Sequence, residues 1–220
     1  MLYFDLSQPF QAGMATSTDP NAFSMDVYRS IQEGDAFNWF RLHLQEHVGT
    51  HMDSPFHFRQ EGRKINELKM EEFFVESRII DLSDLQPNEL ITKEMLLAYE
   101  KEHGLIPTEK GLILYTGWSR TWGTMEYLQQ NPGLSAEAAE YLASKNPILI
   151  GLDIPSVDVR GDSAFPAHHA ILSRDIPIIE TLSGELAKVL EVSKDFLLVA
   201  TPLKIIGGTA SPVRPIAIIK

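Results

Sequence analysis

The chain has 220 residues, of which 44% are hydrophobic and 22% are charged, as is typical of a globular protein. It contains no cysteine, which excludes disulfide frameworks, thiol catalysis and iron–sulfur clusters, so nitrogen and oxygen atoms must bind any metal. The formal net charge of -11, without a long basic run, argues against nucleic acid and anionic membranes as partners.

Targeting signals are not evident. The first residues, MLYFDLSQPF, lack the pattern of a signal peptide, and no apolar stretch approaches the ~20 residues that span a bilayer. The cytoplasm is therefore the expected location.

The N-terminal quarter predicts strands and one long loop. Residues 2–7 predict an edge strand, 8–22 a polar loop, and 23–31 and 36–47 two strands joined by a turn at 32–35. Alternation along the last strand points Phe40, Leu42 and Leu44 one way, and Arg41, His43, Gln45 and His47 the other. We expect His47 at the strand's end on its polar face, and the residues after Gly49 and Thr50 to leave the sheet as a loop.

The rest of the chain alternates between strands and helices. Helices are predicted at 88–104, with Thr92 as N-cap and Gly104 as its stop, at 135–146, capped by Ser135, and at 167–175. Strands are predicted at 75–83, 111–117, 147–153, 176–180, 196–205 and 214–220, the last two joined by a glycine-rich turn at 206–213. This order indicates one mixed α/β domain over residues 1–220.

A dense group of histidines marks the segment HVGTHMDSPFH, residues 47–57. His51 and Asp53 share one side of an extended chain, Gly49 permits a bend that returns His47 toward them, and Pro55 stiffens the path to His57. Imidazoles and a carboxylate that converge in this way suit Zn, Mn or Fe, and Asp53 has two oxygens with which to bridge a pair of ions.

Several other polar residues have a simpler interpretation. An isolated histidine is usually a surface or hydrogen-bonded residue, and we read His43 and His103 in that way. Trp122, with Trp118, either lines a pocket or packs in the core. Asp158 belongs to a stretch, GLDIPSVD, to which we give an orienting or structural role.

The histidine segment resembles the H-x-G-T-H-x-D-x-P-x-H signature of the cyclase-like metal-dependent hydrolases, which include bacterial kynurenine formamidases and isatin hydrolases. The segments GLDIPSVD, HHAILSRDIPIIETL and GGTASPVRPIAI are similar to later parts of the same family. The resemblance implies a β-sandwich-like or barrel-like core with surrounding helices. It also implies homodimers or larger homo-oligomers in which neighbouring subunits help to close the pocket.

The resemblance also implies roles for individual residues. His47, His51, Asp53, His168 and Glu180 correspond to metal ligands, with Asp53 and Glu180 shared between two ions, and His57 to a proton donor and acceptor. Zinc is the implied metal, with one or two ions per chain, and manganese is the alternative. His168 and His169 compete for one ligand position, and the twelve-residue spacing to Glu180 favours His168.

The implied reaction is hydrolysis of an amide-like C–N bond in a small molecule, such as a formamide, cyclic imide or lactam, with a metal-bound hydroxide as nucleophile. Two alternatives stay open: a metal-dependent cyclase or dehydratase, and a relative that binds a metal or ligand without catalysis. Formamidases of the family carry a substrate-contacting tryptophan in the N-terminal stretch. Residues 8–22 contain none, so the resemblance does not extend to N-formylkynurenine as substrate.

Overall fold

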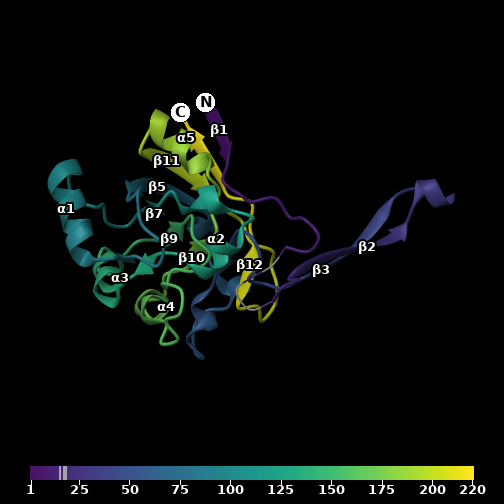
Figure 1. Ribbon diagram of the computed structural model, residues 1–220, viewed down its shortest axis with the longest axis horizontal. Coiled ribbons are helices and arrows are strands. Elements are labelled where there is room, and N and C mark those ends of the chain that lie inside the picture. Colours follow the sequence, from purple (N-terminus) through teal and green to yellow (C-terminus); the bar gives the residue numbers. More distant parts are fainter. Residues whose placement is uncertain (15, 17–18) are drawn as a thin grey trace.

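A mixed sheet organises most of the chain in the computed structural model, which describes residues 1–14, 16 and 19–220 (Figure 1). Part of the predicted 8–22 loop, residues 15, 17 and 18, lies outside the described residues. Within the described residues the sheet has nine strands: β1 (Leu2–Asp5), β13 (Ile216–Ile219), β11 (Asp195–Val199), β5 (Phe74–Asp81), β7 (Gly111–Tyr115), β9 (Leu149–Leu152), β10 (Ile178–Glu180), β4 (His51–Asp53) and β12 (Ala210–Pro212), in that spatial order.

The centre of this sheet is parallel and its two ends are antiparallel. Strands β5, β7, β9 and β10 run parallel, whereas β1, β13 and β11 join one end and β4 and β12 the other as antiparallel neighbours. The sheet curls into a half-barrel with few helices, which confirms the predicted mixed α/β class with a barrel-like core. Two minor sheets pair β2 (Phe23–Arg29) with β3 (Trp39–Leu44), and β6 (Leu90–Ile91) with β8 (Gly133–Leu134).

Alternating side chains of the central strands build a core on each face of the sheet. Leu112 and Leu114 of β7 join a cluster with helices α1 (Lys93–His103), α3 (Ala136–Ala143) and α4 (Pro166–Leu172). Ile113 faces the opposite cluster, which includes α5 (Glu185–Val192). The remaining helix, α2 (Met125–Gln129), follows a 3₁₀ turn at Trp118–Thr121.

The predicted helix boundaries depend on local hydrogen bonds, and these are present. Thr92 accepts a bond from the backbone N–H of Met95, and Ser135 accepts one from Ala138. Gly104 ends α1 at a φ of 87°, donating its N–H to the carbonyl of Glu100. Helix α1 nevertheless begins at Lys93 rather than at residue 88, because Leu90–Ile91 pairs with β8 instead.

Further predictions of local structure were wrong around the histidine segment and the C-terminal strands. The histidine segment does not leave the sheet, because His51–Asp53 forms strand β4. The predicted turn at 206–213 contains β12, which pairs with β4, and the preceding strand ends at Val199. Strand β3 ends at Leu44, so His47 lies in the following turn instead of at the strand's end.

The β2–β3 hairpin extends far from the sheet as a two-stranded arm (Figure 1). Nearly all of its residues are exposed. Within the described part of the chain, no helix has both the length and the apolar character needed to cross a bilayer.

Candidate metal centre

Strand pairing brings three of the predicted site residues onto one face of the sheet. His51 on β4 lies directly opposite Glu180 on β10, and Asp53 is two residues further along β4. Because alternate residues of a strand point to the same side, the side chains of His51, Asp53 and Glu180 converge. All three are almost completely buried.

The turn before β4 returns His47 to this cluster. Gly49 has a φ of 61°, a left-handed conformation that favours glycine. The hydroxyl of Thr50 donates to the carbonyl of Thr181 at 2.6 Å and accepts from the N–H of Gln8 at 2.8 Å, which ties the turn to its surroundings. As a result, Nδ1 of His47 lies 2.8 Å from Oδ1 of Asp53.

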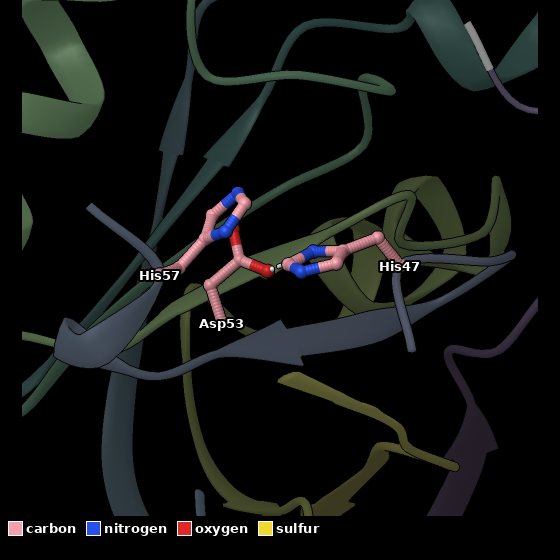
Figure 2. A group of neighbouring side chains, drawn as sticks. All are labelled: His47, Asp53 and His57. Carbon is pink, nitrogen blue, oxygen red and sulfur yellow. Dashed lines mark ion pairs between the residues drawn. The ribbon is translucent and has the colours of Figure 1, made fainter. Parts of the chain in front are cut away.

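The residues after β4 bring His57 beside His47 and Asp53. Pro55–His57 forms a single 3₁₀ turn, with proline at its start. Figure 2 shows the side chains of His47, Asp53 and His57 grouped together, with the ion pair between Asp53 and His47 marked. The centres of the two imidazole rings are 4.0 Å apart, so these rings are in contact.

Helix α4 supplies the last member of the cluster. His168 is buried, and its Nε2 lies 3.3 Å from Oε1 of Glu180 and 3.6 Å from Oδ2 of Asp53. His169 is exposed, because adjacent residues of a helix point about 100° apart. The structure therefore brings together all six predicted site residues and places His168 rather than His169 among them.

Each of three imidazoles is held by a partner on the nitrogen that faces away from Asp53. Nδ1 of His51 bonds to the carbonyl of Gly49 at 2.9 Å, and Nδ1 of His168 to Oδ2 of Asp158 at 2.5 Å. Nε2 of His47 bonds to the hydroxyl of Thr209 at 3.0 Å. That hydroxyl donates to Oε2 of Glu46 at 2.6 Å, so it accepts the proton of His47.

When these imidazoles are neutral, this network leaves a free lone pair on the other nitrogen of each ring, the one that faces Asp53. Three lone pairs then face the buried carboxylates of Asp53 and Glu180. Ring nitrogens of His47 and His51 lie at ion-pair distances from Asp53. Even so, neither oxygen of Asp53 accepts a properly oriented hydrogen bond within the described chain. A buried carboxylate in this condition is unfavourable without a cation, so the donor set fits a divalent metal ion.

Among residues 1–14, 16 and 19–220, two groups of three donors are close enough to hold an ion, and both include Asp53. One group is His47, Asp53 and His57, and the other is His51, Asp53 and Glu180, the donor atoms of each group lying within 4.8 Å of one another. Asp53 therefore has the position of a carboxylate shared between two centres. His57, predicted as a proton carrier, also lies within reach of the first one.

Protonation compensates for the buried carboxylates when no cation is bound. Burial alone would lower the pKa of His51, but the charges of Asp53 and Glu180 outweigh it and raise this pKa to about 9. Burial also opposes the charged form of His168, yet Asp158, Asp53 and Glu180 raise its pKa well above the usual range. Burial is the main cause that lowers the pKa of His57 to about 4. The nearby imidazoles of His47, His51 and His168 lower it further, and the charge of Asp53 opposes the shift.

The cluster forms one wall of a pocket of about 600 Å³. Aromatic side chains of Phe58, Trp122 and Phe165 line it, which the sequence did not predict except as one option for Trp122. Phe58 stacks on His168 with ring centres 4.6 Å apart. An apolar pocket with a few converging polar groups is the usual form of a small-molecule site.

The other residues considered from sequence lie outside the cluster. His43 pairs with Asp26 on the exposed arm at 2.9 Å. Trp118 is buried in the core, and its Nε1 donates to the carbonyl of Tyr127. Asp158 has the orienting role described above.

Comparisons with known proteins agree with this arrangement. The Cyclase family model matches residues 4–159. The kynurenine formamidase of Bacillus cereus is 34% identical over 216 residues, covering 97% of this chain and 96% of the relative, and that of Bacillus anthracis is 35% identical with the same coverage. Isatin hydrolase A from Labrenzia aggregata superimposes with a TM-score of 0.84 and 25% identity, covering 100% of this chain and 94% of that structure. The chain therefore belongs to the Cyclase family, together with these hydrolases.

Proposed function

We propose that this metal-dependent hydrolase cleaves a non-peptide amide C–N bond in a small arylformamide, cyclic imide or lactam. The observation that carries the proposal is the buried carboxylate of Asp53, which lacks an oriented hydrogen-bond donor yet lies among three fixed imidazoles and Glu180. The similarity to kynurenine formamidases and to isatin hydrolase supports the same class of bond.

We assign His47, His51, Asp53, His168 and Glu180 as the ligands, with zinc as the metal and manganese as the alternative, because both accept imidazole and carboxylate donors. A divalent ion bound at this site would polarise a carbonyl group and lower the pKa of water. The ligands orient the centre, since Thr209, Gly49 and Asp158 fix the directions of the three imidazoles.

His57 is the proposed proton carrier. The leaving nitrogen of an amide is strongly basic and departs only when it is protonated. With its pKa held near 4 by burial, His57 is neutral at pH 7 and can accept a proton from water before delivering it to the leaving nitrogen. Phe58 and Phe165 line the pocket beside the cluster, where they provide faces for an aromatic ring.

The test uses metal-loaded protein and a substrate panel of formanilide, N-formylkynurenine and isatin. We expect hydrolysis of at least one member, with incorporation of ¹⁸O from labelled water into the product, which separates hydrolysis from ring closure or dehydration. The matched variants are Asp53→Asn, which removes the shared charge with little change in shape, and Asp84→Asn at an exposed position outside the pocket and the arm. The proposal is supported if activity is lost in Asp53→Asn and kept in the control variant. It is contradicted if both variants lose activity equally.

We also propose that the protein is a homodimer or larger homo-oligomer joined through the β2–β3 arm. Residues directly opposite each other on β2 and β3 point to the same face of the arm. The pairs Met25–Leu42 and Val27–Phe40 thus place four apolar side chains together on one face. Val27 is 59% exposed and Leu42 54% exposed. A two-stranded hairpin alone is marginally stable in water, so an uncovered apolar ribbon favours a partner.

A second copy of the chain is the partner that fits this arm. The opposite face carries Asp26 opposite Arg41, and His43 pairs with Asp26, so charges are matched within each arm and no excess charge calls for a polar ligand. Two apolar ribbons related by a twofold axis bury each other. We further propose that residues 1–220 act as one domain in the cytoplasm, whose reducing conditions suit a chain without cysteine.

A further inference from the structure

A single arginine lines the catalytic pocket. Among the described residues around it, Arg160 is the only lysine or arginine, and it lies on the loop that joins β9 to α4. The metal cluster is on the wall formed by β4 and β10, so the pocket offers both a reaction centre and a separate permanent positive charge.

The guanidinium of Arg160 has no hydrogen-bond or ion-pair partner in the described part of the chain. Arg174 shares this condition, whereas the other arginines contact a carboxylate, a carbonyl or an aromatic ring: Arg29, Arg41, Arg59, Arg63, Arg78, Arg120 and Arg214. Arg174 lies outside the pocket. An unpaired arginine at a ligand pocket is available for a planar anion.

The acidic residues of the pocket are already engaged. Asp158 binds His168, and Glu180 accepts the N–H of Val157 at 2.7 Å. Asp162, two residues from Arg160, accepts the N–H of Ala164 at 2.9 Å and makes no ion pair with Arg160.

The backbone that carries Arg160 is fixed by the segment around β8. The N–H of Arg160 donates to the carbonyl of Asn131, and Nδ2 of Asn131 donates to the carbonyl of Asp158 at 3.0 Å. Gly133 packs so closely here that a Cβ on it would lie 2.0 Å from the backbone nitrogen of Val159. The loop thus holds the base of the arginine side chain in a defined place, which reduces the entropic cost of binding.

We propose that Arg160 binds a carboxylate on the substrate, so that the preferred substrates are amides with an anionic group remote from the scissile bond. A chain with a net charge of -11 repels anions in general, and a local cation is the simplest way to accept one. This inference rests on the proposed function and specifies its substrate class.

The experiment compares 4-formamidobenzoate with 4-formamidobenzamide, which differ in charge but hardly in shape. We expect wild-type protein to favour the carboxylate, and Arg160→Met to lower the ratio of the two kcat/KM values by about tenfold or more, as for loss of a charge-assisted hydrogen bond. Arg160→Lys should retain part of the preference. Arg174→Met is the matched control and should leave the ratio unchanged.

An unchanged ratio in Arg160→Met, or an equal effect of Arg174→Met, would overturn the inference while leaving the proposed function intact. If wild-type protein hydrolyses neither compound nor any member of the wider panel, the proposed function fails instead. Calorimetric titration with 4-formamidobenzoate then still decides the role of Arg160, since only wild-type protein should bind it tightly.

Discussion

Replacing Thr209 by valine should weaken metal binding without touching any ligand. Valine keeps the shape of threonine but removes the hydroxyl that accepts the proton of His47 Nε2 at 3.0 Å and donates to Glu46 at 2.6 Å. The ring of His47 then loses the bond that fixes its orientation and its tautomer. Loss of such a supporting bond typically costs about 10–100-fold in metal affinity, or about 1.4–2.7 kcal/mol.

The assay is calorimetric titration of metal-free protein with Zn²⁺, with circular dichroism to check the fold. Thr209→Ser retains the hydroxyl and should bind Zn²⁺ nearly as tightly as wild-type protein. If folded Thr209→Val binds Zn²⁺ with unchanged affinity, His47 is not held through Thr209 and the assigned tautomer is wrong.

Three further predictions test the site and the arm. His57→Ala should retain bound metal but lose about 10²–10⁴-fold in kcat, the usual contribution of a general acid or base; a parallel loss of metal in elemental analysis would make His57 a ligand instead. At pH 7.5, metal binding should release about two protons, because the pKa values of His51 and His168 are raised in the metal-free protein and both protons must leave before the nitrogens bind a metal. Metal affinity should therefore rise with pH up to about 9. Calorimetric titration in buffers of different ionisation enthalpy measures the released protons, and a result of no proton release would contradict this prediction. Leu42→Glu on the arm should convert the oligomer to monomer in light scattering, whereas Glu33→Gln at its tip should not; a wild-type monomer would contradict the proposed interface.

Local features of this fold could be predicted because their causes lie within a few residues. The caps at Thr92 and Ser135 and the stop at Gly104 each depend on one nearby hydrogen bond. The histidine segment could be recognised because its residues are close together in the sequence.

The long-range arrangement of the site could not be predicted in the same way. Strand β4 has three residues, too few to show an alternating pattern, and it forms only by pairing with β10 and β12, more than a hundred residues away. The contact of His47 with Thr209 spans 162 residues. Helix α5 was not predicted at all, and no motif pointed to Arg160, because its place at the pocket follows from the fold of the β9–α4 loop.

We propose that one metal centre is bound by five residues: His47, His51, Asp53, His168 and Glu180. Anomalous diffraction from crystals of the zinc-loaded protein tests this directly. We expect a peak beside Asp53, with imidazole nitrogens at about 2.0–2.1 Å from it. A fully loaded protein whose anomalous peaks all lie away from Asp53 and Glu180 would contradict it.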